Sequence, residues 1–279
     1  MNSSFTEKEL IQLSRQIRAD IIEMIYRVHM GHPGSSLSAV ELLVALYFCT
    51  MRVNPTEPQW EDRDRFVLSK GHASPALYSV LARKGYFPVS ELAGFRQYGS
   101  PLTAYPDMNT PGVDMESGSL GNGLSTGVGI ALYGKFHQKE YRTYVMLGDG
   151  ELQEGMIWEA AMCAAHHSLD HLTAIVDRNQ LQINGMVKDI MSISPLEEKW
   201  RAFGWKVLTV DGHHFPSILN ALEEVRRCTG SPCVIIADTV KGKGVSFMEN
   251  QAAWHRSDIT KAQYDQAMSE IMGNGGDQA

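Results

Sequence analysis

Asp149 and Asn179 are the residues of this 279-residue chain whose surroundings most directly indicate chemistry. Asp149 lies between Gly148 and Gly150, where a predicted strand passes into a predicted helix, and Asn179 follows the next apolar run. Glycines let the backbone approach an anion, and a helix N-terminus offers free N–H groups to a phosphate. A carboxylate beside a phosphate requires a cation between them. Asp149, Asn179 and a free carbonyl at Leu181 would supply the oxygen ligands that Mg²⁺ or Ca²⁺ prefers.

These features also have a structural explanation. A single Gly-Asp-Gly segment is more often a turn, and an aspartate after a strand often caps the next turn or helix. Four aspartates follow apolar runs in this way: Asp149, Asp177, Asp211 and Asp238. In an open parallel sheet, ligands bind outside the carboxyl ends of the strands, where these side chains would gather. Gly-Asp-Gly combined with an asparagine at the next strand end favours a cation and diphosphate site over a turn.

The elements that must position these residues are short, continuous apolar runs. They cover residues 65–69, 144–147, 172–176, 207–210 and 234–237. A continuous run is typical of a strand that is buried on both faces of a parallel sheet. Helical stretches separate the runs, so the sequence predicts an α/β fold with a doubly wound parallel sheet.

Two segments near the N-terminus have the pattern of a capping box, in which a hydroxyl residue is followed three positions later by glutamate. The first, at residues 6–9, begins a helix with apolar residues at helical spacing. The second, at residues 38–41, opens the apolar stretch 42–48. We therefore expect His32 and Ser35 to lie in a glycine-rich loop between two helices.

The composition excludes several classes of function. The chain has 25 Lys and Arg against 32 Asp and Glu, a net charge of −7, which disfavours nucleic acid as a partner. Its four cysteines form no pair typical of a zinc or disulfide framework. Neither a signal peptide nor an apolar run long enough to cross a membrane occurs. We expect a cytoplasmic protein with one domain over residues 1–272 and a disordered tail at residues 273–279.

An ordered set of motifs resembles the transketolase family along nearly the whole chain. The segment Gly-Asp-Gly-Glu-Leu-Gln-Glu-Gly at residues 148–155, with Asn179 after it, resembles the thiamine diphosphate fingerprint in its transketolase form. The other matching segments are residues 31–35, 69–73, 118–123 and 241–244, together with Trp254 and His255. No Gly-x-Gly-x-x-Gly opens the first βα unit, which disfavours a dinucleotide-binding fold.

The resemblance implies roles for individual residues. Asp149, Asn179 and the Leu181 carbonyl would hold the metal ion. The diphosphate of thiamine diphosphate would be held by Ser35, His72, Gly150, Asn179, Lys241 and His255. The thiamine rings would be lined by Gly118, Ser119 and Leu120, with Ile183 beside the thiazolium. His32, His72 and His255 would be the catalytic residues, because imidazole can exchange protons with sugar hydroxyls near neutral pH.

Tyr105 departs from the family pattern. Transketolases have Gly-His-Pro followed by an acid where this chain has Ala-Tyr-Pro-Asp at residues 104–107. The resemblance therefore places Tyr105, with His32 and His255, at the substrate. A phenol can form hydrogen bonds but does not titrate near neutrality, so the identity of the donor sugar is left open. The alternative is an aromatic residue that only packs in a surface loop.

The chain has about half the length of a whole transketolase, and no segment resembles the pyrimidine-binding domain of that family. The resemblance therefore implies the N-terminal subunit of a split transketolase, inactive without a separate C-terminal subunit. Together they would form an α₂β₂ assembly, with Glu154 and Glu159 near the subunit junction. The implied reaction transfers a two-carbon ketol unit from a ketose phosphate to an aldose through a thiamine diphosphate carbanion. Two alternatives are a subunit of a keto-acid dehydrogenase or deoxyxylulose-phosphate-synthase-like enzyme, and a non-catalytic regulatory subunit.

Overall fold

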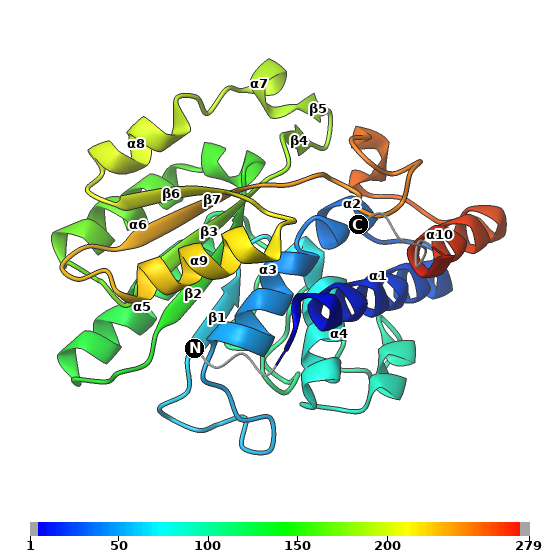
Figure 1. Cartoon of the computed structure of the whole chain (residues 1–279), viewed down its shortest axis with the longest axis horizontal. Coiled ribbons are helices and arrows are strands. Elements are labelled where there is room, and N and C mark those ends of the chain that lie inside the picture. Colours follow the sequence, from blue (N-terminus) through cyan, green and yellow to red (C-terminus); the bar gives the residue numbers. More distant parts are fainter. Residues whose placement is uncertain (1–4, 274–279) are drawn as a thin grey trace.

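A five-stranded parallel sheet forms the centre of the computed structural model, which describes residues 5–273 (Figure 1). The strand order is β1-β2-β3-β7-β6. The strands are β1 (Arg65–Leu68), β2 (Thr143–Gly148), β3 (Leu172–Arg178), β6 (Lys206–Asp211) and β7 (Cys233–Asp238). Each predicted strand is present. Because Gly148 lies opposite Asp177, and Asp177 opposite Ala237, the segments that follow β2, β3 and β7 leave the sheet at one edge.

Helices cover both faces of the sheet, which confirms the predicted doubly wound α/β fold. One face carries α1 (Glu7–Val28), α3 (Val40–Val44), α4 (Ser74–Lys84) and α9 (Phe215–Arg226). The other face carries α5 (Asn122–Phe136), α6 (Gly155–His166) and α8 (Leu196–Ala202). Shorter helical segments are α2 (Pro33–Leu37), η1 (Ala45–Thr50), η2 (Gly71–Ala73), η3 (Val89–Gly94), η4 (Gly150–Gln153), α7 (Val187–Ile190) and η5 (Ala252–His255).

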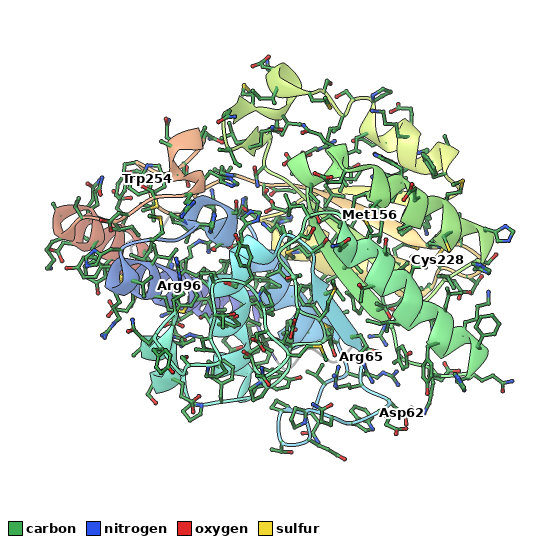
Figure 2. All side chains as sticks on the ribbon, turned by 180° about the vertical axis from the view of Figure 1, so that it is seen from behind. Asp62, Arg65, Arg96, Met156, Cys228 and Trp254 are labelled. Carbon is green, nitrogen blue, oxygen red and sulfur yellow. The ribbon has the colours of Figure 1, made fainter. Side chains whose placement is uncertain are left out.

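Alternate residues of each central strand pack into two separate cores, and side chains fill the space between the layers (Figure 2). Tyr144 and Met146 face the first core, whereas Val145 and Leu147 face the second. All four are buried, which is why the strand has a continuous apolar run. The expectation of burial on both faces is wrong for β6. This strand lies at the edge of the sheet with a single neighbour, and Thr209 and Asp211 are exposed.

The first capping box is confirmed and the second is wrong. Thr6 Oγ1 accepts the Glu9 N–H, and the Glu9 carboxylate accepts the Thr6 N–H at 2.7 Å. At the second segment, α3 begins after Ala39, and Ser38 does not cap it. The Ser38 hydroxyl instead donates to Asp177 Oδ2 at 2.6 Å. Ser35 lies within the helix α2 rather than in a loop, and His32 directly precedes that helix.

The remaining elements connect the sheet to the surface. A short hairpin, β4 (Leu181–Gln182) with β5 (Gly185–Met186), follows β3, and α10 (Lys261–Gly273) packs on α1. Gly273, the first residue of the predicted tail, ends α10, and residues 274–279 lie outside the described part of the chain. Across residues 5–273, no helix has the length and apolar character needed to span a bilayer.

Candidate active site

One cavity of about 490 Å³ lies at the carboxyl edge of the sheet. It is lined by every residue that the resemblance assigns to the metal, the cofactor or the substrate except Ser119, which is exposed beside it. Strand ends supply Asp149, Asn179 and Lys241, because the segments after β2, β3 and β7 leave the sheet together. Short helical segments supply the rest: His32 and Ser35 at α2, and His72 and His255 in η2 and η5.

The oxygen atoms of Asp149, Asn179 and Leu181 meet at this edge. Asp149 accepts the Gly150 N–H at 2.7 Å and the Gln180 N–H at 2.5 Å, while Asn179 Oδ1 accepts the Leu181 N–H at 3.1 Å. Burial and the nearby carboxylate of Asp177 raise the pKa of Asp149 to about 6. Asp149 is buried and forms no ion pair with a described cation, so a bound divalent ion would compensate for its negative charge. Hard oxygen donors of this kind suit Mg²⁺ or Ca²⁺. The donor set therefore fits the expected metal.

Lys241 brings a positive charge to the same oxygens. Its ammonium donates to the Leu181 carbonyl at 3.1 Å and to Ser35 Oγ at 3.3 Å, and it lies 3.1 Å from His255 Nδ1. Because an ammonium only donates, His255 Nδ1 is the acceptor and the ring proton lies on Nε2. Burial, with the neighbouring charge of Lys70, lowers the pKa of Lys241 to about 8. A buried cation that forms no ion pair with any described carboxylate suits the oxygens of a diphosphate.

Three imidazoles form a triangle over the cavity. The ring centroids of His32, His72 and His255 are 5.2–5.5 Å apart. Burial, followed by nearby positive charges, lowers the pKa of His32 to about 4, that of His255 to about 3, and that of His72 well below its usual value. All three rings are therefore neutral at neutral pH, and each can donate one hydrogen bond and accept another.

Sequence reasoning missed the ion pair beneath the cavity. Lys70 pairs with Asp177, and its ammonium also donates to the Ser35 carbonyl at 2.8 Å. Burial alone would raise the pKa of Asp177, but Lys70 and the hydroxyls of Ser38 and Thr239 hold it below the usual range. Lys70 directly follows the first apolar run, and that position at a strand end was the available signal.

The structure adds further lining residues: Lys70, Gly148, Glu151, Gln153, Glu154, Gln182 and Arg256. Glu151 is buried and accepts the N–H groups of Gly121 and Gly148 at 2.9 and 3.0 Å. It thereby joins the loop before α5 to the Gly-Asp-Gly turn. Glu154 lies at the cavity, whereas Glu159 is exposed on α6.

The apolar part of the cavity is open. Tyr105 lines it and packs on Gly118, where an added Cβ would lie 3.4 Å from the tyrosine ring. Leu120 and Ile183 also line it, and they are 38% and 68% exposed. Large apolar side chains at an open rim would be covered by a bound ring or another protein surface.

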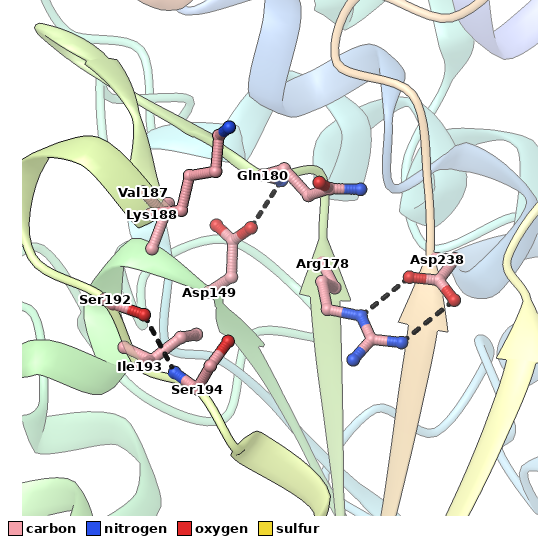
Figure 3. A pocket seen from close by; sticks show the side chains of 9 residues that line it. All are labelled: Asp149, Arg178, Gln180, Val187, Lys188, Ser192, Ile193, Ser194 and Asp238. Carbon is pink, nitrogen blue, oxygen red and sulfur yellow. Dashed lines mark hydrogen bonds and ion pairs between the residues drawn. The ribbon is translucent and has the colours of Figure 1, made fainter.

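The four predicted strand-end aspartates do not share one role. A second cavity, of about 260 Å³, lies beside Asp149, and there Asp238 pairs with Arg178 (Figure 3). Asp211 is exposed and accepts the His213 N–H at 2.8 Å, which is a turn interaction. Only Asp149 of the four lines the larger cavity. The turn explanation therefore holds for Asp211, whereas Asp238 is used in an ion pair with Arg178 rather than in a cap.

The chain matches known proteins along most of its length. The family described as "Transketolase, thiamine diphosphate binding domain" matches residues 6–276. A 6-deoxy-6-sulfo-D-fructose transketolase subunit, SqwG, of Clostridium sp. (strain MSTE9) is 46% identical, over 91% of this chain and 93% of the relative. An apulose-4-phosphate transketolase subunit of Phocaeicola vulgatus is 42% identical, over 92% of both chains.

Other relatives are longer. Rat transketolase is 38% identical over 92% of this chain but only 41% of its own length. The crystal structure of Campylobacter jejuni transketolase superposes with a TM-score of 0.91 at 31% identity, and it covers 96% of this chain and 43% of that one. The chain thus spans less than half of these proteins, and it matches the smaller subunits almost completely. The chain belongs to the transketolase family, in which it corresponds to the thiamine diphosphate-binding part.

Proposed function

We propose that this chain is the thiamine diphosphate-binding subunit of a two-subunit transketolase that transfers a two-carbon ketol unit from a ketose phosphate to an aldose. The observation that carries the proposal is the joint presence, in one cavity, of an oxygen ligand set, a lysine without an ion pair among the described residues and three neutral imidazoles. The near-complete match to chains named as transketolase subunits supports the division into two subunits.

The residues divide into two groups. Asp149, Asn179 and the Leu181 carbonyl would hold Mg²⁺ or Ca²⁺ against a diphosphate. Lys241 would bind the diphosphate, together with Ser35, His72, Gly150 and His255. Bound thiamine diphosphate would supply a carbanion equivalent that cleaves the bond next to the ketose carbonyl. Gly118, Ser119, Leu120 and Ile183 would border its rings.

The imidazoles would handle protons and sugar hydroxyls. Because His32 is neutral, its ring can accept a proton from one hydroxyl and donate to another, whereas His255, whose Nδ1 accepts from Lys241, would offer its Nε2 proton. His72 would be the third member of this group, because its ring lies 5.2 Å from each of the other two. Tyr105 would face the donor sugar as a hydrogen-bonding group that stays protonated.

The partner would be a separate C-terminal subunit with a pyrimidine-binding domain, in an α₂β₂ complex. The exposed side chains of Leu120 and Ile183 mark the side of the cavity that this partner would cover. Glu154 and Glu159 would lie near the junction. Four cysteines without disulfides are consistent with a cytoplasmic location.

The test is a ketol-transfer assay with thiamine diphosphate and Mg²⁺, using the chain alone and the chain purified with a candidate C-terminal subunit. We expect transfer only from the pair. The pair that carries Asp149→Ala should bind the cofactor no better with Mg²⁺ than without it. Full activity of the lone chain would contradict the division into subunits, and unchanged cofactor affinity in Asp149→Ala would contradict the metal site.

A further inference from the structure

We propose that His213 is a positioning residue for Lys241, the buried lysine of the cavity. His213 lies in the loop between β6 and α9, and its side chain is 12% exposed. Its Nε2 accepts the N–H of Val240, the residue directly before Lys241, at 2.8 Å. It thereby holds the turn at residues 240–244 from outside the cavity. The inference rests on the proposed function, because it names the contact that would hold a cofactor-binding residue in place.

The tautomer of His213 follows from its two neighbours. A backbone N–H can only donate, so Nε2 is the unprotonated nitrogen of a neutral ring. The ring proton is then on Nδ1, which lies 2.9 Å from Glu41 Oε2 and donates to it. Burial alone would raise the pKa of Glu41, but the charge of Arg18 and the hydrogen bond from His213 lower it to about 2. The Glu41 carboxylate therefore fixes both the tautomer and the orientation of the imidazole.

Arg18 completes this network and contacts the same turn a second time. Its guanidinium forms a two-point ion pair with Glu41, with N–O distances of 2.7 and 2.8 Å, and both side chains are buried. Its Nε donates to the Lys243 carbonyl at 2.9 Å. Arg18 belongs to α1 and Glu41 to α3, and the two helices pack on each other (Figure 1). The network therefore holds the backbone on both sides of Lys241.

The turn itself leaves little space for adjustment. Gly242 has a φ of 80°, and an added Cβ there would lie 2.4 Å from the Met248 carbonyl oxygen. The Gly242 N–H donates to the Gly34 carbonyl at 3.0 Å, and a Cβ on Gly34 would lie 2.9 Å from Lys241 Cγ. The aliphatic part of Lys241 therefore packs directly on the backbone of α2.

Lys241 needs such restraint before a cofactor binds. Its ammonium is buried, and its contacts within residues 5–273 are with uncharged groups rather than with a carboxylate. A buried charge without a counter-charge is unfavourable, so the ammonium gains free energy by moving toward solvent. Movement of the turn would allow this. By fixing the turn, His213 keeps the ammonium where the diphosphate would bind, which lowers the cost of ordering the site on binding.

The experiment uses two amides that separate the two hydrogen bonds of the imidazole. The amide of glutamine reaches the position of Nε2, so His213→Gln keeps an acceptor for the Val240 N–H. The amide of asparagine reaches only the position of Nδ1, so His213→Asn keeps a donor for Glu41 and loses that acceptor. Titration calorimetry measures thiamine diphosphate binding, with excess Mg²⁺, to each variant in complex with its partner subunit.

We expect the cofactor to bind about fivefold more weakly in His213→Asn and less than about twofold more weakly in His213→Gln, because only the first loses the bond to Val240. The kcat of ketol transfer at saturating cofactor should stay within about twofold of the wild type in both, since His213 acts on binding through Lys241. Denaturant unfolding of the variant chains should show similar stabilities for the two amides.

His214→Asn is the matched control, because His214 is exposed beside His213 and its Nδ1 lies 2.7 Å from Ser217 Oγ, away from the turn. It should bind the cofactor as the wild type does. Wild-type affinity in His213→Asn, or a loss in His213→Gln as large as that in His213→Asn, would overturn the inference and leave the proposed function intact. A wild-type complex that binds no thiamine diphosphate would overturn both.

Discussion

Two buried polar clusters lie next to each other at the carboxyl edge of the sheet. The lower cluster consists of Lys70, Asp177, Ser38 and Thr239, and its ion pair is surrounded by hydrogen bonds. The cavity cluster consists of Asp149, Lys241, His32, His72 and His255. Asp149 has backbone donors but forms no ion pair with a cation within residues 5–273, and the rings of His32 and His72 form no hydrogen bond with any described residue.

The difference separates structural from functional polar groups. Burial by itself raises the pKa of the carboxyl group in each cluster, Asp177 in the lower one and Asp149 in the cavity. Only for Asp177 do partners within the chain outweigh burial and hold the pKa below the usual range. Removing one partner of a buried ion pair is destabilising, because the other charge is left uncompensated, whereas a buried charge without a pair marks a candidate ligand site. The two clusters should therefore respond in opposite ways to the loss of a carboxylate.

The largest effect is expected for Asp177→Asn. This change leaves the ammonium of Lys70 buried without a counter-charge, so the free energy of unfolding should fall by about 3–5 kcal/mol. Denaturant unfolding of the chain measures it. Asp211→Asn is the matched control, because Asp211 ends the exposed strand β6, and its effect should be below about 0.5 kcal/mol. Equal effects in the two variants would remove the distinction between the clusters.

Asp149→Asn should raise the free energy of unfolding rather than lower it. The pKa of Asp149 is raised from 3.8 to about 6, so folding favours the protonated acid. Its contribution to stability is present below about pH 4 and is lost as the pH rises to about 6. Without metal or cofactor, the variant should exceed the wild type in free energy of unfolding by up to about 3 kcal/mol at about pH 8.

Unfolding curves between about pH 4 and pH 8 check this prediction. The wild type should lose stability over that interval, and the variant should lose less. A variant that is less stable than the wild type at about pH 8 would show that the carboxylate belongs with the structural cluster.

The smallest effect is expected for Lys241→Gln. Removing this cation should weaken thiamine diphosphate binding about tenfold, or about 1.4 kcal/mol. Because the pKa of Lys241 is lowered to about 8, wild-type affinity should fall as the pH rises above that value. Titration calorimetry at several pH values measures both effects. Lys243→Gln, which removes a more exposed lysine near Glu249, should keep the wild-type affinity and its pH dependence.

Most of the fold could be predicted because its signals are local. Continuous apolar runs identified every strand of the main sheet, and the Thr6 capping box identified the start of α1. The failures came from contacts between distant segments. Ser38 has the local sequence of a helix cap, but the buried carboxylate of Asp177 takes its hydroxyl. The partial exposure of β6 does not follow from its edge position alone, because β1 lies at the other edge and is mostly buried; it depends on how little of the chain packs over Thr209 and Asp211.

The residues of the cavity could be predicted from sequence motifs, but the residues around the cavity could not. Asp149 and Asn179 stand out because glycines and strand ends flank them in the sequence. His213 carries no such signal, because its contact with Val240 joins segments that are 27 residues apart. The resemblance placed Ser119 with Gly118 and Leu120 at the thiamine rings, but Ser119 is exposed beside the cavity that its two neighbours line.

The spacing of the three imidazoles couples the protonation of one ring to that of the others. With centroids 5.2–5.5 Å apart, a charge on one ring opposes protonation of the other two. The rings therefore titrate as a coupled set rather than as three independent groups, and any measured pKa belongs to the set. Replacing one histidine would alter the protonation of the remaining two, so the effects of single and double replacements should not be additive.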